Sequence, residues 1–111
     1  MNRVFKALSD PTRRRVLQLL RERPMMAGEL SEHFAVSKPT MSAHFSVLQE
    51  AGLIEAEKSG RMIWYRLKMS VLEDALLSFA QTLGWEMKAP ERGSHRSENS
   101  RAKRRPLKGE A

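Results

Sequence analysis

Small polar and basic residues gather where one helix of the chain is predicted to begin. The stretch Ser37-Lys38-Pro39-Thr40 opens this helix, because serine is a good N-cap and proline suits the first turn. A helix N-terminus carries partial positive charge that favours phosphate, and hydroxyls pair with several kinds of base edge. These residue types therefore predict nucleic-acid binding, with Lys38, Thr40 and Ser42 as the strongest expected contacts.

The period of this helix predicts which face makes the contacts. Met41, Phe45 and Leu48 recur at helical spacing and form a buried stripe. The opposite face, which we expect to enter the major groove, contains Ser37, Lys38, Pro39, Thr40, Ser42, Ala43 and Ser46. This face lacks the arginine and glutamine pairings that discriminate strongly between bases, so we expect specificity to depend partly on DNA shape.

Two helices are predicted near the start of the chain. Asp10-Pro11 indicates the start of a helix, because aspartate is a good N-cap and proline suits the first helical position. The apolar spacing that follows predicts a helix over residues 11–23. Ahead of it, Val4 and Phe5 belong to a short apolar repeat that predicts a helix too small to be stable alone. We therefore expect the first helix to pack against another element.

The next elements form a helix-turn-helix in sequence. Ala27, Leu30 and Phe34 share one side of a short helix of about two turns. A three-residue turn, residues 35–37, leads into the helix predicted over residues 38–51. Two short helices joined in this way, the second beginning with small polar and basic residues, are typical of DNA-binding proteins.

A basic hairpin is predicted directly after this motif. Residues 54–58 and 62–67 alternate as strands do, and Ser59-Gly60 is the predicted turn. Lys58 and Arg61 lie at the predicted tip, where they could meet phosphate. The sequence thus predicts a mainly α fold with a small β-hairpin, a winged helix-turn-helix.

The last predicted helix carries an apolar seam. Its large apolar residues are spaced 4, 3 and 4 apart, as in helices that pair along their length. Together with two residues of the first helix they give the expected dimer interface: Val4, Phe5, Leu72, Leu76, Phe79 and Leu83. We therefore expect a homodimer joined through its terminal helices. Trp64 and Trp85 are expected to cover the core and this seam, with a ligand-binding surface as the alternative.

The charge of the chain is unevenly distributed. The net charge is +7 and the isoelectric point about 10.4, which favours a polyanionic partner. Residues 1–87 hold 12 Lys and Arg against 10 Asp and Glu, and residues 88–111 hold 8 against 3. We expect a DNA-binding and dimerisation domain over 1–87 and a disordered basic tail over 88–111, which either aids solubility or adds nonspecific DNA affinity.

Several other classes of protein are not expected. The absence of cysteine excludes disulfides, thiolate metal sites and cysteine nucleophiles. Glu29 and His33 are four residues apart, but two ligands without a third favour a solvated polar face, and His44 is expected to be structural or to contact phosphate. The methionines are expected to fill the core, and the glycines form no phosphate-binding loop. We therefore expect no enzyme, metal or cofactor.

The sequence contains no membrane or secretion signal that we recognise. No apolar run approaches the roughly 20 residues of a membrane-spanning helix, and the first residues lack a secretory pattern. We expect a cytoplasmic, nucleoid-associated protein with no membrane insertion.

Several segments resemble the ArsR family of bacterial winged-helix repressors. They are residues 5–17, residues 29–34, residues 36–45, residues 48–54, Gly60-Arg61 and residues 64–67. The resemblance implies repression of a target operon, often including the gene of the repressor itself. Double-stranded operator DNA is then the expected partner. Many family members carry arginine where Ala43 stands, so a known operator sequence cannot be transferred.

Within the family, the chain resembles the SdpR-like branch, which lacks the thiolate metal site. Metal-sensing branches carry a cysteine pair in the first helix of the motif, whereas residues 25–30 contain none. Those branches also use histidines and acids on the last helix, and residues 69–87 contain no histidine. Two alternatives stay open on the same fold: a module that docks another protein, and a sensor of an unidentified small-molecule effector.

Overall fold

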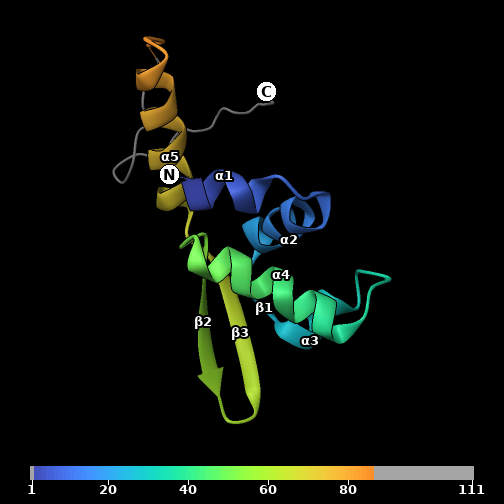
Figure 1. The fold of residues 1–111 in the computed structure, drawn as a ribbon. Helices are drawn as coiled ribbons and strands as arrows, with labels where there is room; N and C mark the ends of the chain where they lie inside the picture. Colours follow the sequence, from blue (N-terminus) through green and yellow to red (C-terminus); the bar gives the residue numbers. More distant parts are fainter. Residues whose placement is uncertain (1, 87–111) are drawn as a thin grey trace, which may run out of the picture.

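Five helices and a three-stranded sheet make up residues 2–86, which are the residues described in the computed structural model (Figure 1). In chain order the elements are α1 (Asn2–Leu8), α2 (Pro11–Glu22), β1 (Met25–Met26), α3 (Ala27–Ser31), α4 (Lys38–Glu50), β2 (Ile54–Ser59), β3 (Met62–Leu67) and α5 (Met69–Thr82). This is the predicted winged helix-turn-helix. The predicted tail, residues 88–111, lies outside the described residues.

The two predicted capping residues begin their helices as expected. A carboxylate oxygen of Asp10 accepts the backbone N–H of Arg13 at 3.1 Å, at the start of α2. The hydroxyl of Ser37 accepts the N–H of Thr40 at 3.3 Å, at the start of α4. The predicted end of α2 is one residue late, because Arg23 is extended (φ −172°) ahead of a proline that disfavours helical backbone before it.

Helix α3 is shorter than the predicted two turns. It ends at Ser31, and the N–H groups of His33 and Phe34 then bond to carbonyls three residues back, at 3.0 and 3.1 Å. These tighter bonds end the α-helical pattern while Phe34 stays half-buried against the core. The turn between the two helices is therefore longer than the predicted three residues, because residues 32–37 separate α3 from α4.

The sheet has one strand that was not predicted, and its turn lies one residue later than predicted. Strand β1 adds to the hairpin through two residues only, with Met25 opposite Tyr65 and Met26 opposite Trp64. Ser59 pairs with Met62, so the loop is Gly60-Arg61. Gly60 has φ +63° and Arg61 does not have a positive φ, which is the pattern of a type II′ hairpin turn.

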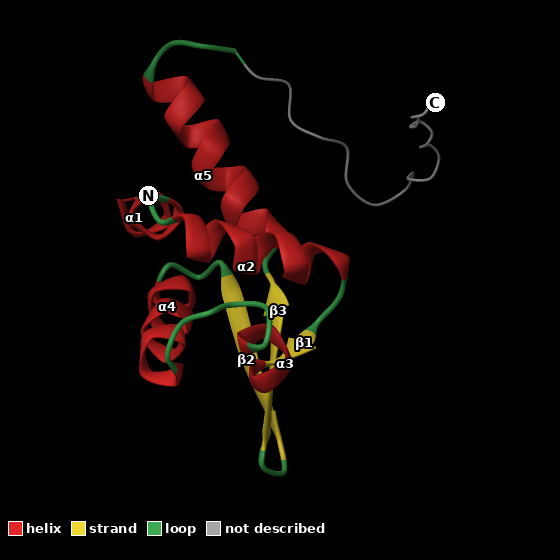
Figure 2. Cartoon of the chain, turned by 90° about the vertical axis from the view of Figure 1, so that its right-hand side faces the viewer, coloured by secondary structure: helices red, strands yellow, loops and turns green. Residues whose placement is uncertain are grey.

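The core lies where α2, α3 and α4 meet the sheet. Its most deeply buried large side chains are Val16, Leu30, Met41, Leu48 and Leu53. Helix α5 extends from one end of this body, and the β2–β3 hairpin extends from the opposite end (Figures 1 and 2). Within residues 2–86, no helix is both long and apolar enough to cross a membrane.

Candidate nucleic-acid interface

Helix α4 has one buried face and one exposed face, as its period predicts. Met41, Phe45 and Leu48 are 1%, 4% and 0% exposed. All seven residues of the predicted contact face of this helix are exposed: Ser37, Lys38, Pro39, Thr40, Ser42, Ala43 and Ser46. The buried stripe fixes the rotation of the helix, so the hydroxyls and the lysine must face outwards.

The first turn of α4 divides its hydroxyls between two roles. The Ser37 hydroxyl caps the helix and lies 2.9 Å from the hydroxyl of Thr40. In the described part of the chain, Lys38, Ser42 and Ser46 make no side-chain hydrogen bond or ion pair. Ser37 and Thr40 therefore stabilise the helix start, while the other three side chains keep their full capacity for a partner.

The β2–β3 hairpin separates its charges onto two faces. Residues opposite each other in the register share a face, so Lys58 lies with Ile63, and Ala56 lies with Tyr65. Tyr65 is buried, and its ring packs on Phe45 of α4 with the ring centroids 4.7 Å apart. Lys58 is therefore on the face that packs towards α4.

The acidic residues of the hairpin lie on its other face and are paired. Arg66 reaches Glu57 at 3.3 Å and Glu55 at 3.9 Å, and Lys68 reaches Glu55 at 3.6 Å. Neither Lys58 nor Arg61 makes an ion pair or hydrogen bond with the described residues, and both are exposed. The tip of the hairpin and the start of α4 thus present unneutralised positive charge.

A polar cluster behind α4 was not predicted from the sequence. The guanidinium of Arg13 donates to the carbonyls of Ala7 at 2.8 Å and Lys6 at 3.1 Å, at the end of α1. In addition, Nη1 of Arg13 lies 3.2 Å from Nδ1 of His44 on α4. Arg13 therefore connects α1, α2 and the predicted recognition helix. The sequence signalled only the Asp10 cap of this cluster, because His44 lies 31 residues from Arg13 along the chain.

Asp10 completes this cluster. One of its carboxylate oxygens lies 3.9 Å from Nδ1 of His44, whose side chain is 16% exposed. Partial burial acts to raise the pKa of Asp10, but the backbone N–H of Arg13 and the nearby His44 outweigh it and leave the pKa below its ordinary value. The carboxylate is thus held in its charged form, in which it caps α2. His44 has the structural role that its position predicts.

Glu29 is not available as a free ligand. It is paired with Arg23 and accepts the backbone N–H of Met26 at 3.4 Å. The hydrogen bond from Arg23 lowers the pKa of Glu29 below its ordinary value. No cluster of three or more histidine, aspartate or glutamate side chains that could hold a metal occurs within residues 2–86.

The residues expected at a dimer interface occupy two environments. Val4 is 5% exposed within the core of its own chain, and Leu72 is half-buried against that core. Phe79 of α5 is 45% exposed and packs on Phe5, with ring centroids 5.2 Å apart. Leu76 and Leu83 are also exposed.

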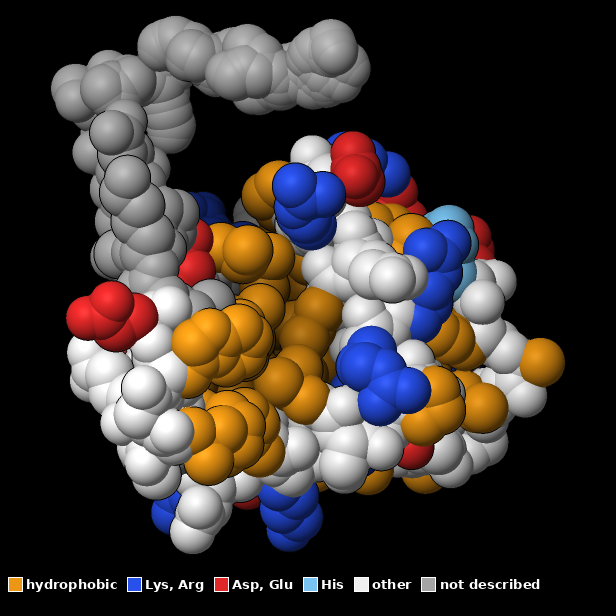
Figure 3. Space-filling model, turned by 90° about the horizontal axis from the view of Figure 1, so that it is seen from above, with side chains coloured by type: hydrophobic (Ala, Val, Ile, Leu, Met, Phe, Trp, Pro, Cys, Tyr) orange, Lys and Arg blue, Asp and Glu red, His pale blue; other side chains and the backbone are white. Residues whose placement is uncertain are grey.

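Apolar side chains thus gather on the α1 and α5 end of the molecule. A space-filling view of this end shows them surrounding a hollow (Figure 3). Trp85 follows α5 and is 63% exposed, whereas Trp64 on the hairpin is half-buried. An apolar surface of this kind on a small chain is typical of an interaction site.

The fold, the exposed start of α4 and the basic hairpin define a winged helix-turn-helix DNA-binding regulator. A family model described as a helix-turn-helix domain matches residues 8–57. The transcriptional repressor SdpR of Bacillus subtilis (strain 168) is 47% identical over 76 residues, which cover 68% of this chain and 84% of SdpR. The arsenical resistance operon repressor of Staphylococcus aureus is 36% identical over 76 residues, covering 68% of this chain and 73% of that repressor.

A solved structure agrees with these sequence matches. The crystal structure of an ArsR family transcriptional regulator superposes with a TM-score of 0.67 at 33% identity, covering 75% of this chain and 93% of that one. The chain belongs to the ArsR family of winged helix-turn-helix transcriptional regulators, as its motifs predict. The matched proteins are transcriptional repressors and not enzymes.

Proposed function

We propose that the chain is a homodimeric repressor that binds an inverted-repeat operator. Two features carry the proposal. On the exposed face of α4, Lys38, Ser42 and Ser46 have no side-chain partner in the described part of the chain, and the hairpin tip carries two cations that are not paired with a described residue. The recognition helix would enter the major groove, and Lys58 and Arg61 would contact phosphate. Such a dimer represses by covering the promoter, and it acts at the nucleoid in the cytoplasm.

Leu76, Phe79 and Leu83 are exposed on α5 and form what is here called the apolar α5 surface, which supports the dimer. A two-fold dimer contact uses the same patch on both chains, and it relates the two recognition helices by the same symmetry that relates the halves of an inverted repeat. Residues 88–111, which carry eight of the chain's lysines and arginines, would add sequence-independent attraction to the phosphate backbone.

Genome-wide binding of the tagged protein, followed by nuclease footprinting on the strongest site at physiological salt, tests this function. We expect a short protected inverted repeat at a promoter. The affinity should fall steeply with salt, because phosphate contacts release counterions. Diffuse, salt-labile binding with no protected site would contradict operator recognition and favour a module that docks another protein.

A matched pair of lysine variants tests the assigned contact surface. Lys38→Ala removes the charge at the start of α4, and we expect weaker operator binding with an unchanged oligomeric state. Lys68→Ala is the control, because Lys68 faces Glu55 on the other side of the hairpin. A gel-shift titration in which the two variants bind equally well would remove Lys38 from the interface.

A further inference from the structure

Two adjoining hollows lie between α3, α4 and the hairpin. One has a volume of about 630 Å³ and extends from α3 to Arg61 and Met62 on the hairpin. The other, of about 500 Å³, extends from α3 to Lys38 and Ser42 on α4. Ala27, Gly28, Glu32 and Ile63 line both hollows. The two hollows therefore adjoin along α3. Together they are here called the α3 groove, and each has the size of a small-molecule site.

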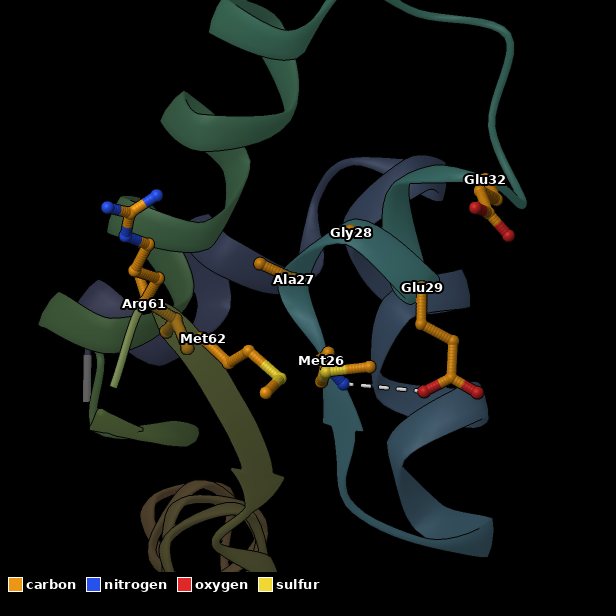
Figure 4. A pocket seen from close by; sticks show the side chains of 8 residues that line it. Met26, Ala27, Gly28, Glu29, Glu32, Arg61 and Met62 are labelled. Carbon is orange, nitrogen blue, oxygen red and sulfur yellow. Dashed lines mark hydrogen bonds between the residues drawn. The ribbon is translucent and has the colours of Figure 1, made fainter. Parts of the chain in front are cut away.

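The walls of the α3 groove are mostly apolar. The Met62 side chain extends from β3 towards β1, where Met26 lies (Figure 4). On the α4 side, Phe45, Tyr65 and Val36 line the groove, and Val36 is 41% exposed. Phe45 and Tyr65 are only 4% and 6% exposed, so the ligand surface comes mainly from Val36 and the two thioethers. These suit a flat apolar ligand, because methionine adapts its shape to aromatic surfaces.

The ends of the α3 groove are cationic. Arg61 lies at one end and Lys38 at the other, and neither is paired with a described residue. Two carboxylates, those of Glu29 and Glu32, also line the groove. Glu29 is bonded to Arg23, and Figure 4 shows Glu29 and Glu32 extending on the other side of α3 from Arg61. Arg61 and Lys38 are therefore the two cations of the groove that an anionic group can contact.

We propose that the α3 groove is an effector site for a small organic anion with a flat apolar body, such as an aromatic carboxylate, and that its occupation excludes DNA. The exclusion follows because the ligand and the phosphate backbone would compete for the same two cations, Lys38 and Arg61. The exclusion rests on the proposed function, whereas binding of the anion does not. The ligand would release the operator by its differential affinity for the DNA-free state.

Gly28 allows the α3 groove to be filled without disturbing the fold. A Cβ atom built on Gly28 meets nothing within 4 Å, and Gly28 has no positive φ. Leucine is also a better helix former than glycine. Gly28→Leu should therefore fold normally and occupy the groove, and Gly28→Ala is the matched control that leaves most of the space open.

Binding is tested first without DNA, using the full chain and sodium 2-naphthoate as the probe in isothermal titration calorimetry. A ligand of about a dozen non-hydrogen atoms should bind with a Kd on the order of 1 mM. We expect Gly28→Leu to weaken binding by at least about tenfold, Gly28→Ala to retain it, and the neutral 2-naphthalenemethanol to bind more weakly than the anion. No saturable binding to the unmodified chain, or equal binding to Gly28→Leu, overturns the site.

Competition with operator DNA is tested second, at constant ionic strength maintained with sodium chloride. We expect naphthoate to release DNA from the unmodified chain and not from Gly28→Leu. Retention of DNA at saturating naphthoate overturns the exclusion. Naphthoate binding in a chain that protects no operator contradicts the proposed function and supports the groove, whereas operator protection without naphthoate binding contradicts the groove alone.

Discussion

Arg13 supports the predicted DNA-binding surface from behind, without belonging to it. Its guanidinium bonds to the last carbonyls of α1 and to His44 on α4. Removing it leaves part-buried groups without partners, so we expect Arg13→Ala to lower the free energy of unfolding by about 1–3 kcal/mol in urea denaturation. Lysine cannot reproduce the forked geometry, so Arg13→Lys should recover only part of this loss.

Arg15 provides the control for that experiment. Arg15 is exposed, and its side chain donates to Gln18 at 3.1 Å and to no other described residue. Arg15→Ala should change the free energy of unfolding by no more than about 0.5 kcal/mol. Equal losses in Arg13→Ala and Arg15→Ala would show that the bonds of Arg13 contribute nothing specific.

The lowered pKa of Asp10 makes one part of the stability depend on pH. A carboxylate whose pKa is lower in the folded chain stabilises the fold fully above its unfolded pKa of about 3.9, and this stability is lost as the pH falls through the folded pKa. Asp10→Asn keeps a capping side chain but does not titrate. We expect the unmodified chain to lose stability relative to Asp10→Asn as the pH falls below about 5.

Urea unfolding of both proteins at a series of pH values measures this difference. Glu29 titrates in the same range, since its pKa is also lowered, but it is present in both proteins. The difference between the two proteins therefore isolates Asp10. A difference that stays constant between about pH 6 and pH 2 would contradict the charged cap.

At the scale of the elements, the hairpin owes its expected function to the separation of its charges. Arg61 is unpaired at the turn, whereas Arg66 is paired with Glu55 and Glu57 on the other face. We expect Arg61→Ala to weaken DNA binding on all sequences alike and to reduce the slope of log affinity against log salt by about 1. Filter-binding titrations at a series of salt concentrations measure this slope, and Arg66→Ala should leave it unchanged. If both variants reduce the slope, the two faces of the hairpin do not differ in their contact with DNA.

The sequence predicted those elements that depend on local chemistry. Asp10 and Ser37 are capping residues, and the helices that they begin start where predicted. Strand β1 has only two residues, too few for a period, and it exists because Met25 and Met26 pair with the hairpin far along the chain. The turn lies at Gly60-Arg61 and not at the predicted Ser59-Gly60, because the pairing of β2 with β3 sets its position and places Ser59 opposite Met62.

The same limit applies to the candidate site. The exposed face of α4 followed from helical period alone, because one buried stripe fixes the other side. The contact between Arg13 and His44 and the α3 groove each join residues from separate elements, so no local pattern indicates them. Val4 shows the same effect in reverse, since packing within the chain buries a residue that was expected at the dimer contact.

At the scale of the whole molecule, the two ends of the chain's long axis have different surfaces. The hairpin end carries the exposed cations Lys58 and Arg61, whereas apolar side chains gather at the α5 end (Figure 3). Leu76 and Leu83 of this apolar end are 41% and 64% exposed. Linking two DNA-binding domains raises the apparent affinity for two half-sites by roughly 10²–10⁴ without any new contact to DNA. Operator affinity should therefore depend on residues far from the DNA.

Leu76→Lys and Leu83→Lys test this dependence, because each introduces a charge into the apolar α5 surface without replacing a core residue. We expect sedimentation velocity to show a dimer for the unmodified chain and monomers for both variants, and the affinity for a two-half-site operator to fall by roughly 10²-fold or more. Ser78→Lys adds the same charge at an exposed polar position of α5 and should remain dimeric. Two outcomes would contradict this dimer: a monomeric unmodified chain on its operator, or equal results for Leu76→Lys and Ser78→Lys in both measurements. In either case the α5 surface has another occupant, and each half-site is bound independently.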